Sequence, residues 1–295
     1  MIRIKLNVEL AYDVLENGVD FIFNVEAART SSQVVRDEYF SLSQPLLVTR
    51  FIDAHSGNRY VRVRADQGPL KLNYSATVDI THHRTNPATL PEVPVQFLRP
   101  EVLSYLYPSR YCQSDRLSAM ANAEFGRLWH GHSRVASIVD WVTQHITFMS
   151  STSNSHTSAV DTLIERVGVC RDFAHVMIAL CRALNIPARL ATGTDYGADP
   201  ALGPPDFHAY VEVYLGDRWY IFDPSGTGIP MGFIRLGTGR DAADVAFATI
   251  FGKVSAYSPL IHAEAIVDSS SDFVLPTPCS DALSTDDGRP RVASL

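Results

Sequence analysis

The pattern of hydrophobic and polar positions first changes along this chain near residue 115. Before that point, apolar residues alternate with polar or small ones, which is the period of a strand with one buried face. The alternation is clearest over residues 2–8, 21–25, 60–64 and 70–80. Turn sequences separate these runs, and no helical period interrupts them. The pattern therefore predicts an antiparallel β-sandwich in the N-terminal third of the chain.

Helical periodicity begins after a connector rich in proline. Residues 87–108 contain five prolines, a composition that favours an extended and semi-rigid segment. Apolar residues then recur at helical spacing, which predicts helices over residues 117–128, 133–146, 159–167 and 170–184. Beyond Pro187 the period returns to that of strands, over residues 188–194, 207–215, 218–222, 233–236 and 260–267. Helices followed by an antiparallel sheet indicate an α+β fold in this half.

These patterns predict a protein of two parts and a tail. Residues 1–108 form the N-terminal β-sandwich, and residues 109–280 form a second domain in which a buried helix packs on an antiparallel sheet. Residues from about 281 to 295 are polar, and we expect them to form a loose C-terminal tail.

Composition narrows the class of protein. The chain has 295 residues, of which 46% are hydrophobic, and carries a net charge of −7. It contains no run of lysine and arginine, so we expect no nucleic-acid partner. No apolar run approaches the length of a membrane span, and the first residues lack a hydrophobic signal core. We therefore expect a cytoplasmic protein that does not bind membranes.

The cysteines and histidines give no metal or disulfide pattern. The four cysteines show no C-x-x-C spacing, and Cys170 and Cys181 lie about 16 Å apart if both are on one helix. His130 and His132 lack a third ligand nearby, and an exposed turn explains them more simply than a metal site. We expect no disulfide, no metal and no cofactor.

The predicted helix over residues 170–184 begins at a cysteine. On a helical projection Cys170 falls in the apolar arc, so this thiol points toward the protein interior. A helix N-terminus offers unpaired N–H groups and the positive end of the dipole, which favour a nucleophilic thiolate and could hold an oxyanion. Taken by itself, Cys170 is better explained as a small core residue, as free cysteines usually are.

Two further residues make a catalytic reading stronger. His208 begins a predicted strand, and the turn Gly216-Asp217 connects it to a second strand that ends at Asp223. Pairing Leu215 with Arg218 places His208 diagonally opposite Asp223, within side-chain reach. A thiol needs an imidazole as base and acid, and the imidazole needs a carboxylate to orient it. The sequence alone does not place Cys170 against His208.

These segments resemble the bacterial transglutaminase-like superfamily. The resemblance rests on four motifs: Gly168-Val169-Cys170-Arg171-Asp172-Phe173-Ala174-His175, Ile186-Pro187-Ala188-Arg189, His208-Ala209-Tyr210-Val211-Glu212-Val213 and Trp219-Tyr220-Ile221-Phe222-Asp223-Pro224. The downstream segment from Gly239 to Val245 and the N-terminal strands are also similar to this family. It implies a papain-like core with Cys170 as nucleophile, His208 as base and acid, and Asp223 as the orienting carboxylate. Transglutaminases, cysteine peptidases and other amide-cleaving enzymes share such folds, so the resemblance leaves the reaction open.

Other polar residues have simpler interpretations. His175 lies about 140° from Cys170 around the helix, so we expect a structural role, with Asp172 as its partner. Arg240, Asp241 and Asp244 could line the cleft or form a salt-bridged surface loop. A side chain between residues 148 and 157 could supply an oxyanion donor, because that stretch leads toward the cysteine helix.

The sequence thus supports a thiol-dependent acyl-transfer enzyme acting on amide or peptide bonds, with a protein or peptide as substrate. Hydrolysis and transamidation stay open, because water and amines compete for the same thioester. One alternative is a catalytically idle fold that serves as a binding or scaffolding module. A second is a cysteine-based isomerase or transferase of a small metabolite. Substrate identity and oligomeric state do not follow from the sequence.

Overall fold

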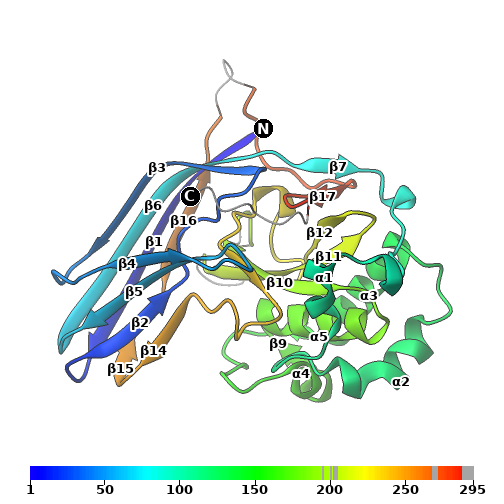
Figure 1. Ribbon diagram of the computed structural model, residues 1–295, viewed down its shortest axis with the longest axis horizontal. Helices are drawn as coiled ribbons and strands as arrows, with labels where there is room; N and C mark the ends of the chain where they lie inside the picture. The colour runs from blue at the N-terminus through cyan, green and yellow to red at the C-terminus, as the bar shows by residue number, and fades with distance from the viewer. Residues whose placement is uncertain (195, 200, 202–204, 268–271, 288–295) are drawn as a thin grey trace.

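The computed structural model describes residues 1–194, 196–199, 201, 205–267 and 272–287. A strand-rich part and a helix-containing part lie side by side in Figure 1. The predicted α+β class is confirmed, and the change of period near residue 115 coincides with the first long helix.

Two antiparallel sheets form the strand-rich part (Figure 1). The first has the order β15-β1-β6-β3, with β16 also paired to β1, and the second has the order β14-β2-β5-β4. Their strands are β1 (Ile2–Val14), β2 (Val19–Phe23), β3 (Gln33–Leu42), β4 (Thr49–Ile52), β5 (Arg59–Ala65), β6 (Gly68–Ile80), β14 (Ala248–Phe251), β15 (Val254–Ala256) and β16 (Leu260–Ala265). Alternate residues of β1, β2, β5 and β6 fill one hydrophobic core between the sheets, as the period predicts.

Three of these strands correct the predicted domain boundaries. Residues 248–265 were expected in the second domain, but β14, β15 and β16 complete the sheets of the N-terminal sandwich. β16 pairs with β1 from Ile4 opposite Ala265 to Glu9 opposite Leu260. The physical reason is that β6 covers only one edge of the long β1, and a returning segment satisfies the other edge.

The proline-rich connector is not extended as predicted. It follows the short strand β7 (His83–Thr85) and contains the helical turns η1 (Pro87–Thr89), η2 (Val95–Phe97), α1 (Pro100–Leu103) and η3 (Ser104–Leu106). Pro87 and Pro100 each stand at the start of a helical turn, where proline loses no hydrogen bond and its fixed φ suits the helix.

The helix-containing part surrounds one buried helix. Its elements are α2 (Ser114–Phe125), α3 (His132–His145), β8 (Thr147–Phe148), α4 (Ala159–Glu165), β9 (Val167–Gly168), α5 (Cys170–Ala183), β10 (Ala188–Thr194), β11 (Phe207–Leu215), β12 (Arg218–Phe222), η5 (Pro230–Gly232) and β13 (Gly237–Gly239). The four helices lie where the sequence predicts them. The sheet has the order β12-β11-β10-β13, and α5 packs between it and α2, α3 and α4. The strand expected at 233–236 is instead the approach to β13.

The expected loose tail is ordered wherever the structure describes it. The strand β17 (Ala282–Ser284) pairs with β7, and Ser284 and Thr285 are buried. The carboxylate of Asp286 contacts the guanidinium groups of Arg189 and Arg235, which also hold the fully buried Glu212. Residues 288–295 of the predicted tail lie outside the described residues. No helix in the described ranges is long and apolar enough to span a membrane.

Candidate active site

Cys170 is the first residue of α5, and the chain enters this helix along a tightly fixed path. The backbone N–H of Val169 donates to Asp172 Oδ2 at 2.9 Å, which caps the first turn. A Cβ on Gly168 would lie 2.7 Å from the Cβ of Asp172, so this position needs a glycine. Cys170 is partly buried and packs at the edge of the helix core, as its apolar position predicts.

The loop before α4 is tied to the start of α5. Asp172 Oδ1 accepts a hydrogen bond from Ser153 Oγ at 3.0 Å, and the guanidinium of Arg171 contacts Ser153 and donates to the carbonyl of Asn154 at 2.9 Å. The N–H of Met149 donates to the carbonyl of Gly168 at 2.9 Å. The predicted proximity of residues 148–157 to the cysteine helix is therefore present, and an oxyanion role for this stretch stays a prediction.

His208 and Asp223 come together at the open end of the β11–β12 hairpin. Leu215 pairs with Arg218, the register that the sequence predicts. The imidazole Nε2 of His208 lies 3.3 Å from Asp223 Oδ2, and the side chains are 2% and 3% exposed. The contact has the distance of an ion pair, and this nitrogen has no partner with hydrogen-bond geometry among the described residues.

Asp223 is held by the loop that follows it. Its Oδ1 accepts hydrogen bonds from the backbone N–H of Ser225 at 3.1 Å and from Ser225 Oγ at 2.6 Å. Its Oδ2 accepts a third from the N–H of Gly228 at 3.3 Å. Burial opposes ionisation, but the charge of His208 and these hydrogen bonds outweigh it and lower the pKa of Asp223. Asp223 is therefore an oriented carboxylate rather than a neutral acid.

The environment of His208 favours its protonated form. Burial alone would lower the pKa of His208, but the charge of Asp223 and the side-chain interactions of the imidazole with Asp223 and Cys170 raise it to about 10. The ring of Phe233 packs on the imidazole with centroids 4.8 Å apart. The structure thus brings together the three site residues that the sequence singles out, including the contact of Cys170 with His208 that the sequence could not place.

His175 has a different partner from the one expected. The histidine is fully buried, its ring stacks on Tyr111 with centroids 5.1 Å apart, and its Nε2 accepts a hydrogen bond from the N–H of Ala242 at 3.2 Å. Asp172, the expected partner, instead caps the helix start. Burial lowers the pKa of His175 to about 3, so the ring is neutral and structural.

For the segment Arg240–Asp244 the sequence left two interpretations open, the lining of the cleft and a salt-bridged surface loop, and its residues behave differently. Arg240 and Asp244 form a half-exposed ion pair, with Nε to Oδ2 at 2.9 Å. Asp241 is buried and accepts a hydrogen bond from the N–H of Tyr111 at 2.9 Å. Arg182, near the end of α5, donates to the carbonyl of Arg240 at 2.6 Å. This segment therefore lies at the end of α5 opposite Cys170.

Sequence reasoning missed the residues that support the site. Ser225 and Gly228 orient Asp223, and Phe233 packs on His208. A serine and a glycine after a strand-ending Asp-Pro are a turn signal, which could have pointed to this loop. No comparable signal marks Phe233, because its contact depends on how the chain returns after β12.

Comparisons with known proteins agree with this architecture. The family model for the transglutaminase-like superfamily matches residues 121–224, and that for the bacterial transglutaminase N-terminal domain matches residues 2–101. A crystal structure from Cytophaga hutchinsonii, described as a "putative cysteine protease", is 39% identical, with a TM-score of 0.87 over 96% of this chain and 97% of that one. The chain belongs to the transglutaminase-like superfamily.

Curated relatives cover less of the chain. An uncharacterized protein of Mycobacterium leprae is 27% identical over 48% of this chain and 52% of its own length. An uncharacterized protein of Mycobacterium bovis is 33% identical over 34% of this chain and 35% of its own length. The chain thus spans about half the length, or less, of these curated relatives.

Proposed function

We propose that this protein is a thiol-dependent acyl-transfer enzyme that cleaves amide bonds of a protein or peptide through a thioester on Cys170. The observation that carries the proposal is the contact of Cys170 with an imidazole that a buried carboxylate orients. Membership of the superfamily and the description of the Cytophaga protein support the same class.

The first half of the reaction forms the thioester. In this reaction Cys170 attacks as the thiolate, at the N-terminus of α5 and beside protonated His208. The sulfur attacks the carbonyl carbon, and the resulting oxyanion lies near the backbone N–H of Cys170 at the start of α5. The C–N bond then breaks, and His208 gives its proton to the departing amine or ammonia.

The second half releases the acyl group. Water or a second amine attacks the thioester carbonyl, and neutral His208 accepts the proton of that nucleophile. The C–S bond breaks and restores the thiolate, while the imidazole is again protonated. Asp223 keeps Nε2 of His208 turned toward itself throughout, which leaves the other ring nitrogen for the reacting proton.

The direct test is release of ammonia or new amino termini from unfolded protein substrates. Wild type, Cys170→Ala and Cys170→Ser are compared, and mass spectrometry looks for an acyl adduct on Cys170. The proposal expects turnover and an adduct in wild type only. Cys170→Ala acting as fast as wild type contradicts it, and a folded wild type without turnover or adduct favours a binding or scaffolding role.

A further inference from the structure

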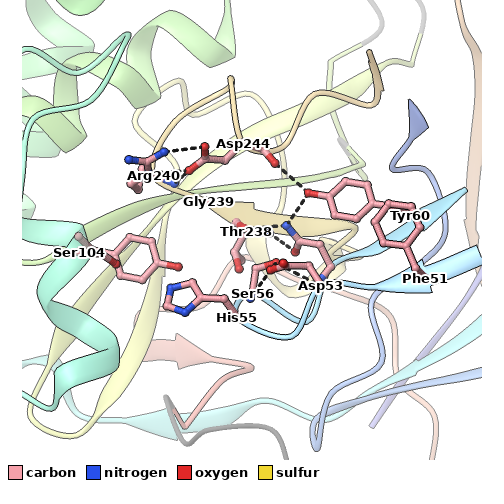
Figure 2. Close-up of a pocket in the computed structure, with 12 residues that line it drawn as sticks. Phe51, Asp53, His55, Ser56, Tyr60, Ser104, Thr238, Gly239, Arg240 and Asp244 are labelled. Atoms are coloured by element: carbon pink, nitrogen blue, oxygen red, sulfur yellow. Dashed lines mark hydrogen bonds and ion pairs between the residues drawn. The ribbon is translucent and has the colours of Figure 1, made fainter. Parts of the chain in front are cut away.

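The buried helix α5 has different surroundings at its two ends. Toward its C-terminal end, Arg182 donates to the carbonyl of Arg240, a residue that lines a pocket of about 460 Å³ (Figure 2). The guanidinium of Arg240 is already paired with Asp244 there, as the dashed lines in Figure 2 show. At the N-terminal end, the first turn of α5 carries Cys170 and the fully buried carboxylate of Asp172. This carboxylate lies two residues from the nucleophile of the proposed reaction.

Asp172 holds the residue before the nucleophile at both of its backbone polar groups. Its Oδ2 accepts a hydrogen bond from the N–H of Val169 at 2.9 Å, and its own N–H donates to the carbonyl of Val169 at 2.8 Å. The N–H of Phe173 donates to the same carbonyl at 3.2 Å. That carbonyl belongs to the planar peptide unit between Val169 and Cys170. The contacts therefore also fix the direction of the N–H of Cys170, which is the oxyanion donor of the proposed mechanism.

The second carboxylate oxygen fixes the side chain of Asp172 itself. Its Oδ1 accepts a hydrogen bond from Ser153 Oγ at 3.0 Å and lies 3.4 Å from Nη2 of Arg171. The same guanidinium contacts Ser153 and donates to the carbonyl of Asn154 at 2.9 Å. Every group in contact with the two oxygens is a hydrogen-bond donor, so the carboxylate accepts on both sides and is held in one orientation.

The chain before Val169 is fitted to this carboxylate. A Cβ on Gly168 would lie 2.7 Å from Cβ and 3.0 Å from Oδ2 of Asp172, so only a glycine leaves room for it. The carbonyl of Gly168 accepts a hydrogen bond from the N–H of Met149 at 2.9 Å, which fixes the same residue to the end of β8. The entry to α5 is therefore held before, at and after Val169.

We propose that Asp172 is a positioning residue for Cys170. By holding Val169, the carboxylate orients the N–H of Cys170 toward the oxygen of the carbonyl under attack, so that the oxyanion meets a donor already in place. This role rests on the proposed function, because only attack at a carbonyl carbon creates an oxyanion. Asp161 offers a comparison, since its Oδ2 caps α4 in the same way, accepting from the N–H of Ser158 at 2.9 Å. The cap of α4 is not attached to the nucleophile.

Two reagents separate this role from a general effect on the thiol. With p-nitrophenyl acetate, the sulfur attacks the ester carbonyl, passes through an oxyanion and expels p-nitrophenolate. With iodoacetamide, the sulfur displaces iodide from a saturated carbon and no oxyanion forms. We expect Cys170 of Asp172→Ala to be acylated at least about tenfold more slowly than in wild type, but alkylated within about threefold of the wild-type rate. Peptide mapping locates each adduct, and circular dichroism confirms that each variant is folded.

Three further variants test the assignment. Asp172→Asn keeps an oxygen for the N–H of Val169, so acylation should stay within about threefold of wild type. Asp161→Ala removes the matching cap from α4 and should change neither rate. Ser153→Ala removes one hydrogen bond to Asp172 and leaves the cap, so it should slow acylation severalfold. It also provides the test if Asp172→Ala does not fold.

The outcomes distinguish this role from the proposed function. Equal slowing of acylation and alkylation in Asp172→Ala would overturn the positioning role and leave the thioester mechanism intact. So would equal slowing of acylation by Asp161→Ala, or unchanged acylation in Ser153→Ala if Asp172→Ala is unfolded. A folded wild type that p-nitrophenyl acetate does not acylate at Cys170 would overturn the proposed function and the positioning role together.

Discussion

His208 and Asp223 meet across the end of a hairpin, with Nε2 3.3 Å from Oδ2 and both side chains almost completely buried. Water cannot screen two charges in such a place well, so each group has a large effect on the other. The pKa of His208 is raised to about 10 and that of Asp223 is lowered. The pair therefore places a protonated imidazole beside the N-terminus of α5, where Cys170 lies.

Replacing Asp223 by asparagine tests that charge. The amide keeps the shape but removes the main influence that raises the pKa of His208, so the imidazolium is lost at lower pH. We expect alkylation of Cys170 by iodoacetamide to slow roughly tenfold or more near neutral pH. The two proteins should converge above pH 10, where His208 is neutral in both. A constant difference at all pH values would mean that the Asp223→Asn change disturbs packing rather than charge.

Ser225 offers a milder test of the same carboxylate. Ser225→Ala removes the 2.6 Å hydrogen bond to Asp223 Oδ1 and leaves the backbone N–H. We expect a loss of about 1 kcal/mol of unfolding free energy and a severalfold slower alkylation of Cys170 at neutral pH. Ser225→Thr retains a hydroxyl and is the matched control. If alanine and threonine behave as wild type does, the loop does not orient Asp223.

The hairpin could be predicted because its information is local. The Gly216-Asp217 turn fixes the register, and the register places His208 near Asp223. The start of α5 is equally local, since helical period and the Gly168-Val169 entry define it. These two elements account for all three residues of the candidate site.

Long-range partners could not be predicted in the same way. β16 pairs with β1 from the far end of the chain, and many alternating segments would satisfy the same edge equally well. The polar composition after residue 280 favours a loose tail. The ion pairs of Asp286 with Arg189 and Arg235 depend on the tertiary structure, so they leave no pattern in the sequence. Loop contacts such as that of Ser225 with Asp223 could not be predicted either, because they depend on the three-dimensional path of the chain.

Asp286 should be important for stability, in contrast to a residue of a loose tail. Asp286→Ala leaves Arg189 and Arg235, both nearly buried, with Glu212 as their remaining carboxylate. We expect chemical denaturation to show a loss of about 3 kcal/mol, as for breaking a buried ion pair. Asp281→Ala is the control, because Asp281 is exposed and 4.0 Å from Arg84, and it should change stability by less than about 0.5 kcal/mol. Equal effects of the two variants would contradict the ordered tail.

The buried His175 should lower the free energy of unfolding of the protein at acidic pH. Its pKa falls from 6.5 in the unfolded chain to about 3 in the buried site. The unfolded state therefore binds more protons between these values, and the stability held above pH 6.5 is lost as the pH falls toward 3. The slope approaches about 1.4 kcal/mol per pH unit for one proton. His175→Phe, which keeps the stack on Tyr111, should remove this part of the slope in urea unfolding measured across that range.

The contact of Cys170 with His208 is tested most directly by the rate at which iodoacetamide alkylates Cys170 at neutral pH in wild type and in His208→Ala. Peptide mapping identifies the modified cysteine, and circular dichroism confirms that both proteins are folded. We expect Cys170 of wild type to react at least about tenfold faster than a model thiol, and His208→Ala to lose that advantage. A wild-type rate equal to that of the model thiol and unchanged in His208→Ala would contradict an activated cysteine at this site.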